Sequence, residues 1–166
     1  METKTIKKTN TSTEDVMVIN RVLDLPVQKV WQALTEPEQF KKWWGPNGYT
    51  CPVSKLEPKE GGKYFNCMRG PDGKDTWSIG TVKQIIPNKK LVVTDSFADK
   101  DGNVVAASEY GMKGNWPKEL LITFDLQETN GGTKLRLQHD GIPKDQQEDC
   151  RNGWTECLDK MEENVK

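Results

Sequence analysis

The chain has 166 residues, a length typical of one domain, and its 24 basic and 25 acidic residues give a formal net charge of −1. This balance argues against a nucleic-acid-binding protein, which usually carries a basic excess, and no apolar run approaches the ~20 residues that a membrane span needs. Residues 1–15 are polar and lack the apolar segment of a signal peptide, so we expect a flexible tail, one domain over residues 16–166 and a cytoplasmic location.

The folded part begins with a strand and two short helices. Residues 16–24 alternate in polarity and are rich in β-branched side chains, which predicts a strand. Pro26 suits the start of a helix over residues 27–34, and Pro37 suits the start of a second helix that ends before Gly45. The proline between them predicts a V-shaped pair of helices and not one long helix.

From residue 50 onward, glycine-rich turns separate segments that alternate in polarity. The expected strands cover residues 51–56, 63–69, 76–86, 90–97, 120–127 and 133–140. Gly80 indicates a bulge or bend within the third of these segments. The short turns predict an antiparallel meander, and the one-sided alternation of the last two strands predicts a sheet with one face in water.

Residues 143–166 predict a long amphipathic helix. Its apolar positions recur at steps of three and four residues and are Cys150, Trp154, Cys157, Leu158, Met161 and Val165. A helix of about 22 residues is about 33 Å long and needs a broad apolar surface beneath it. We therefore expect an α+β fold in which a curved antiparallel sheet holds this helix, with room for a ligand between them.

Several short motifs along the chain carry a family resemblance. They are Arg-Val-Leu-Asp at 21–24, Pro26, Val30, Trp31, Ala-Leu-Thr at 33–35, Pro37, Trp-Trp-Gly-Pro at 43–46, Gly-Gly at 61–62, Met-Arg-Gly-Pro-Asp-Gly at 68–73, Thr-Asp-Ser-Phe at 94–97, Gly-Trp at 153–154 and Leu-Asp-Lys at 158–160. Together they resemble the Activator of heat shock protein 90 ATPase homologue-like family, which belongs to the START-like, birch-pollen-allergen-like (SRPBCC) superfamily. The resemblance implies a helix-grip fold, with a seven-stranded antiparallel sheet around the last helix and an internal apolar cavity.

The same resemblance implies a possible chaperone partner and a role in the stress response. The eukaryotic co-chaperone that names the family has a second, separate domain that engages the chaperone. A chain of 166 residues leaves no room for that domain, which counts against direct ATPase activation. The superfamily also hosts lipid carriers, hormone receptors and cyclases, so the fold alone does not fix the function.

The expected cavity lies between the inward faces of the strands and the stripe of the last helix. Its expected ligand-binding residues are Trp31, Trp44, Tyr64, Asn66, Met68, Trp77, Trp116, Ile122, Phe124, Leu137, His139, Trp154, Leu158 and Met161. Asn66 and His139 are polar exceptions on apolar strand faces, and a buried polar group needs a partner in the protein, in water or in a ligand. The alternative is ordinary core packing, in which the aromatic side chains fill the space.

His139 is the only histidine, and it is a candidate general base or ligand-orienting donor. Alternatively, it is a strand-end residue with a satisfied hydrogen bond. No serine or cysteine nucleophile motif accompanies it, so a hydrolytic triad is not supported. We expect four free, largely buried thiols, because no pair of cysteines has the C-x-x-C spacing.

No metal or cofactor site is expected. The histidine has no neighbours at ligand spacing. The segment 99–103 hints at a calcium loop, but Val104 stands where the turn glycine belongs and Tyr110 where the bidentate glutamate belongs, so we interpret it as a polar turn. The long connection over residues 98–117 is either a lid over the cavity mouth or a packed surface loop.

Three functions remain open from the sequence. The first is a cytosolic module that binds an apolar or amphipathic small molecule in the cavity. The second is a cavity enzyme of the cyclase or hydrolase type that uses His139, and the third is a chaperone-associated interaction module. A monomer and a homodimer are both compatible with the sequence.

Overall fold

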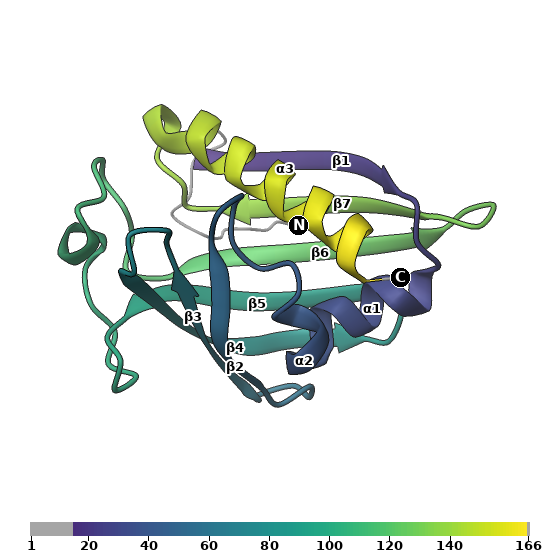
Figure 1. Cartoon of the computed structure of the whole chain (residues 1–166), viewed down its shortest axis with the longest axis horizontal. Helices are drawn as coiled ribbons and strands as arrows, with labels where there is room; N and C mark the ends of the chain where they lie inside the picture. The colour runs from purple at the N-terminus through teal and green to yellow at the C-terminus, as the bar shows by residue number, and fades with distance from the viewer. Residues whose placement is uncertain (1–14, 166) are drawn as a thin grey trace, which may run out of the picture.

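The computed structural model describes residues 15–165, so nearly all of the expected tail lies outside the described residues. Seven antiparallel strands form one sheet in the order β1-β7-β6-β5-β4-β3-β2 (Figure 1). The strands are β1 Val16–Leu23, β2 Thr50–Leu56, β3 Lys63–Arg69, β4 Asp75–Ile86, β5 Lys90–Ala98, β6 Leu120–Glu128 and β7 Thr133–Asp140. Each strand from β2 to β7 pairs with its neighbour in the sequence, which confirms the meander, and β1 adds to β7 at the far edge.

Helices cover one face of this sheet. They are α1 Val27–Thr35, α2 Pro37–Phe40 and α3 Gln147–Asn164, with 3₁₀ turns at η3 Ala107–Tyr110 and η4 Lys144–Gln146. In Figure 1, α3 runs diagonally across β1, β7 and β6, while the strands from β4 to β2 curve away from it. The architecture is therefore the α+β helix-grip fold, with a curved seven-stranded sheet around the last helix.

The last helix is shorter than its sequence pattern predicts. The α-helix has 18 residues and begins at Gln147, after the 3₁₀ turn η4. Pro143 has extended backbone angles, with φ −54° and ψ 142°, so the chain is not yet helical there. Ile142 and Pro143 are both buried, and they anchor the passage from β7 to α3. The expected start at residue 143 is therefore wrong: the chain is extended at Pro143, turns as a 3₁₀ helix from Lys144 and becomes α-helical at Gln147.

The C-terminal half of α3 lies on a solid core. Leu158 and Met161 are fully buried there, together with Leu137 on β7 and Met17 on β1. At the edge, the guanidinium of Arg21 on β1 pairs with the carboxylates of Asp159 and Glu162. Apolar packing and these ion pairs together hold the helix against the β1–β7 half of the sheet.

The exposed and buried residues of β6 and β7 alternate as the sequence predicts. On β6, Leu120, Ile122, Phe124 and Leu126 are buried, and the residues between them are partly exposed. On β7 the same pattern buries Leu135, Leu137 and His139. No helix within residues 15–165 is long and apolar enough to cross a membrane.

Candidate functional site

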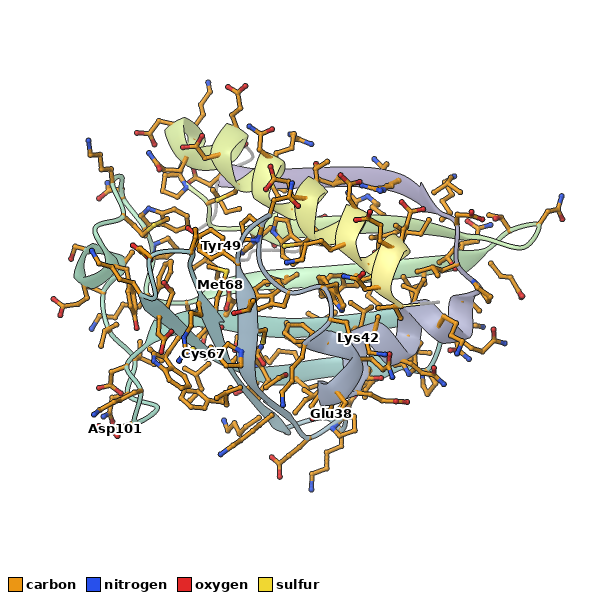
Figure 2. The ribbon with its side chains drawn as sticks, viewed as in Figure 1. Glu38, Lys42, Tyr49, Cys67, Met68 and Asp101 are labelled. Carbon is orange, nitrogen blue, oxygen red and sulfur yellow. The ribbon has the colours of Figure 1, made fainter. Side chains whose placement is uncertain are left out.

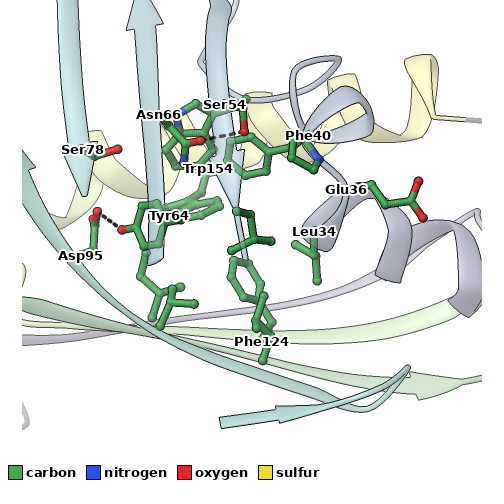
Figure 3. A pocket seen from close by; sticks show the side chains of 16 residues that line it. Leu34, Glu36, Phe40, Ser54, Tyr64, Asn66, Ser78, Asp95, Phe124 and Trp154 are labelled. Carbon is green, nitrogen blue, oxygen red and sulfur yellow. Dashed lines mark hydrogen bonds between the residues drawn. The ribbon is translucent and has the colours of Figure 1, made fainter. Parts of the chain in front are cut away.

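Two adjoining hollows lie where the sheet curves away from α3. The smaller, here called the inner cavity, has a volume of about 50 Å³. It is lined by Leu34, Glu36, Pro37, Phe40, Trp44, Ser54, Leu56, Tyr64, Asn66, Ser78, Leu91, Val93, Asp95, Ile122, Phe124 and Trp154 (Figure 3). The larger, here called the outer cleft, has a volume of about 420 Å³. It is lined by Trp44, Pro46, Tyr49, Met68, Thr76, Ser78, Asp95, Ser96, Phe97, Tyr110, Met112, Trp116, Leu120, His139, Asp149, Cys150, Gly153, Trp154 and Cys157.

Four residues line both hollows: Trp44, Ser78, Asp95 and Trp154. The two spaces therefore meet at one wall, where the side chains of the sheet face those of α3 and the segment after α2. The lining is mostly apolar and aromatic, and it contains no lysine or arginine among the described residues. An apolar pocket with a few placed polar groups is the usual composition of a small-molecule site.

Asp95 is the acidic group at the junction of the two hollows. It lies on the inward face of β5, in line with Leu91 and Val93, and the hydroxyl of Tyr64 donates to its Oδ1 at 2.5 Å (Figure 3). Tyr64 reaches it from β3 across β4, because the intervening residue is Gly80. A Cβ at Gly80 would lie 2.2 Å from Cε2 of Tyr64 and 2.0 Å from the carbonyl oxygen of Thr94.

His139 lies on the inward face of β7 with its side chain only 9% exposed. The indole N–H of Trp154 donates to its Nδ1 at 3.1 Å. Because an indole N–H is only a donor, Nδ1 holds the lone pair and Nε2 carries the proton of the neutral ring. The buried Nε2 has no hydrogen-bond partner within residues 15–165, and it faces Oδ2 of Asp95 at 3.8 Å.

Burial sets the charge of these groups. It lowers the pKa of His139 to about 3, so the imidazole is neutral at pH 7. It raises the pKa of Asp95, although the hydrogen bond from Tyr64 acts in the opposite direction. Burial, together with the charge of Asp95, also raises the pKa of Tyr64 well above its ordinary value. At neutral pH the site thus presents a neutral N–H donor at Nε2 of His139, opposite Oδ2 of Asp95.

A second polar row crosses the curved strands β2, β3 and β4. Ser54, Asn66 and Ser78 are direct neighbours in the strand pairing. The hydroxyl of Ser54 donates to Oδ1 of Asn66 at 2.8 Å (Figure 3). Because all three residues line the inner cavity, they give its lining a strip of polar side chains.

The long connection between β5 and β6 forms one wall of the outer cleft. Tyr110 fastens it, because its hydroxyl donates to the carbonyl of Ala98 and accepts from the backbone N–H of Trp77. The ring of Phe97 then contacts those of Tyr110 and Trp116, with centroids 5.8 and 5.9 Å away. The connection is therefore packed against the cleft. Whether it also opens as a lid stays a prediction.

The segment between α2 and β2 forms the facing wall. Lys160 of α3 donates from Nζ to the carbonyls of Gly45 and Tyr49, at 2.8 and 3.1 Å. Glu156 accepts the backbone N–H of Asn47 at 2.9 Å. Tyr49 and Met68 both line the outer cleft, and Figure 2 shows them next to each other. Two side chains of α3 thus hold this wall in place.

The structure brings nine of the fourteen expected binding residues to the two hollows. They are Trp44, Tyr64, Asn66, Met68, Trp116, Ile122, Phe124, His139 and Trp154. They come from the segment after α2, from β3, β6, β7 and α3, and from the β5–β6 connection. Strand alternation and the helical stripe correctly placed the inward residues among them.

The other five expected residues line neither hollow: Trp31, Trp77, Leu137, Leu158 and Met161. Trp77 points to the opposite face of the sheet, where its ring stacks on Phe65 at 4.9 Å. Leu137, Leu158 and Met161 are 0% exposed in the solid core, where α3 lies directly on the sheet. Trp31 packs against the edge of that core. The two hollows lie beside the first part of α3, from Asp149 to Cys157, and not beneath Leu158 and Met161.

Asp95 is the principal residue that the sequence interpretation missed. Strand alternation places it on the same face as Leu91 and Val93, so it is a polar exception on an apolar face, as Asn66 and His139 are. A search of the predicted strands for polar residues on apolar faces would therefore also have identified Asp95. Its proximity to His139 could not be read in this way, because β6 separates the two strands in the sheet.

The described residues offer no obvious metal site or reactive thiol. No group of three metal-ligating side chains occurs within residues 15–165. All four cysteines are free. Burial raises the pKa of the Cys51 thiol to about 12 and those of Cys67, Cys150 and Cys157 to about 11, so the thiols are protonated at neutral pH.

Solved structures share this architecture across most of the chain. A protein from Nitrosomonas europaea is 23% identical with a TM-score of 0.74, over 92% of this chain and 94% of that one. A protein from Chromobacterium violaceum is 24% identical with a TM-score of 0.76, over 91% and 96% of the two chains. A protein named AHSA1 from Silicibacter pomeroyi is 19% identical with a TM-score of 0.71, over 89% and 95%. These identities are low, so the similarity concerns the fold.

Comparison of the sequence with known families identifies the family of this chain. No curated protein matches the chain. The family described as Activator of Hsp90 ATPase homolog 1-like protein matches residues 24–166, which include both α1 and α3 and six of the seven strands. Since the match covers most of the sequence and the structural neighbours have the same helix-grip fold, the chain belongs to the Activator of Hsp90 ATPase homolog 1-like family.

Proposed function

We propose that this protein binds a small apolar or amphipathic molecule in the outer cleft, with part of the ligand reaching into the inner cavity. The observation that carries this proposal is the buried Nε2 of His139, a donor without a partner within residues 15–165 at the wall of a largely apolar cleft of about 420 Å³. A buried polar group without a hydrogen bond is costly, and a ligand's polar end would remove that cost.

The lining residues support a neutral or amphipathic ligand. Trp44 and Trp154 present aromatic surface at the junction, with ring centroids 5.2 Å apart, and Asp95 adds one carboxylate. The free thiols support our further proposal of a cytoplasmic location.

A cavity enzyme that uses His139 as its acid or base receives less support from the same geometry. The lone pair of Nδ1 is occupied by the indole N–H of Trp154, and a pKa of about 3 makes the ring a weak base. The raised pKa values of the four thiols also disfavour a thiolate nucleophile.

Family membership also supports a chaperone-associated role as a second candidate, since the family is described by its homology to an activator of the Hsp90 ATPase. Addition of this protein to a purified Hsp90 ATPase assay would test it. A concentration-dependent change in the ATP hydrolysis rate would support this role. An unchanged rate would leave small-molecule binding as the better proposal.

The first test of ligand binding uses N-phenyl-1-naphthylamine, a neutral dye that fluoresces in apolar surroundings. We expect saturable binding with roughly micromolar affinity, about −8 kcal/mol. Native mass spectrometry of freshly purified protein would show whether a small molecule copurifies. Absence of saturable dye binding would contradict the proposal.

Ser78→Phe supplies the matched variant for this titration. Ser78 lies on the inward face of β4 at the wall shared by the two hollows, so a phenyl ring there would occupy their junction. We expect at least tenfold weaker dye binding. Thr123→Phe on the outward face of β6 adds the same ring outside the cavity and is expected to bind as the unmodified protein does. Equal affinities of the two variants would place the dye elsewhere.

A further inference from the structure

The gap between His139 and Asp95 limits which chemical groups of a ligand can bind there. On one side is the N–H of Nε2, which is buried and has no acceptor within residues 15–165. On the other side is Oδ2 of Asp95, while Oδ1 of the same carboxylate already accepts from Tyr64. The two atoms are 3.8 Å apart, which is too far for a direct hydrogen bond.

One oxygen atom that both accepts and donates can bridge the two atoms from a position beside the line that joins them. Hydrogen bonds of about 2.8 Å to each side allow a single oxygen to reach two atoms at this separation. It must accept from His139 and donate to Asp95, and a hydroxyl group does both. A ketone or ether oxygen only accepts, and so leaves Oδ2 of Asp95 facing another acceptor.

We propose that this gap recognises the hydroxyl group of a neutral ring compound, such as a phenol. The inference rests on the proposed small-molecule function and specifies the ligand class. The rings of Phe97, Trp116 and Trp154 line the same cleft, and flat apolar ligands pack well against such surfaces.

The charges around the gap disfavour an anionic ligand. Asp95 and Asp149 both line the outer cleft, and no described lysine or arginine side chain lines either hollow. A carboxylate in the gap would face Asp95 directly without a cation to offset the repulsion. Hydroxyl compounds are therefore expected to bind in preference to the corresponding acids.

The test compares 2-naphthol, 2-methoxynaphthalene and 2-naphthoate by calorimetric titration of the whole chain near pH 7. We expect 2-naphthol to bind at least tenfold more tightly than either analogue, because only it can both accept and donate in the gap. Equal binding of all three would overturn the inference, since the gap would then hold water only, and would leave the proposed function intact. Failure of all three and of the neutral dye would contradict the proposed function itself.

Asp95→Asn tests the role of the carboxylate with almost no change of shape. Because the Tyr64 hydroxyl keeps an acceptor, the amide oxygen is expected at the position of Oδ1 and the amide N–H opposite His139. The gap would then contain two donors, and the preference for 2-naphthol over 2-methoxynaphthalene should disappear. Asp125→Asn is the control, because Asp125 lies on the outward face of β6 and pairs with Lys90. An unchanged preference in Asp95→Asn would refute the inference.

The single histidine gives a direct readout that does not depend on a variant folding. The imidazole N–H proton of His139 can be observed by NMR in the unmodified, ¹⁵N-labelled protein. Saturation with 2-naphthol is expected to shift this proton downfield, as a new acceptor arrives at Nε2. If 2-naphthol binds without moving it, the hydroxyl lies elsewhere and the inference is wrong.

Discussion

The absence of a side chain at Gly80 allows Tyr64 to reach Asp95. The Tyr64 ring passes over Gly80 on β4 to reach Asp95 on β5, and these three residues are successive across the sheet. The backbone of β5 is equally close, because a Cβ at Gly80 would lie only 2.0 Å from the carbonyl oxygen of Thr94. The bulge that the sequence suggested near Gly80 lies between Val82 and Gln84, so close approach is the reason for glycine here.

Gly80→Ala is therefore expected to destabilise the protein by about 1–3 kcal/mol or more, since both the backbone and the Tyr64 ring would have to move. Urea unfolding followed by tryptophan fluorescence measures the change. Ser78→Ala on the same strand, which already has a Cβ, should change stability by less than about 0.5 kcal/mol. If both substitutions change the free energy of unfolding by similarly small amounts, Gly80 is not in close contact with Tyr64 and the backbone of β5.

At the scale of elements, α3 has two different halves. Leu158 and Met161 in its C-terminal half are buried in the core with residues of β1 and β7, whereas residues from Asp149 to Cys157 line the outer cleft. Trp154 stands between them: its ring contacts Trp44 and Phe124, and its N–H binds His139. One residue thus joins the core to the candidate site.

Trp154→Ala should cost about 3–5 kcal/mol, because it removes a large buried ring and leaves a cavity. Trp154→Phe keeps most of the ring but removes the donor to His139, and is expected to cost about 1–3 kcal/mol. Denaturant unfolding of both variants provides the values, with exposed Glu163→Ala as a control within about 0.5 kcal/mol of the parent. A loss of stability below about 1 kcal/mol for Trp154→Ala would show that Trp154 of α3 is not packed against the sheet.

At the scale of the whole molecule, the buried His139 links stability to pH. Its folded pKa of about 3 lies below the ordinary value of 6.5. At a pH between these two values, the unfolded chain therefore binds a proton at His139 and the folded chain does not. Asp95 on β5 faces it at 3.8 Å, and Asp149 and the protonated Cys150 of α3 line the same cleft. Asp95 acts in the opposite direction, because its raised pKa favours the folded state as the pH falls towards 3.8.

We expect the stability contribution of neutral His139 to be complete above pH 6.5 and to be lost progressively as the pH falls towards about 3. At about 1.4 kcal/mol per pKa unit, the loss reaches several kcal/mol. Urea unfolding at pH 7 and pH 4 should therefore show a smaller pH-dependent loss in His139→Gln than in the parent protein. Parallel losses in the two proteins would mean that His139 is not buried in the neutral form.

The periodicity of the sequence determined the strands, the two short helices, the α+β class and the inward faces of β6 and β7, since alternation and the helical repeat are local properties. It also identified Asn66 and His139 as polar exceptions. Only the tertiary structure decided where the cavity lies, because this depends on how far α3 reaches and where β4 to β2 curve away from it. The same long-range geometry buried Met161 and Leu158 in solid core, turned Trp77 outward and brought Asp95 to 3.8 Å from His139.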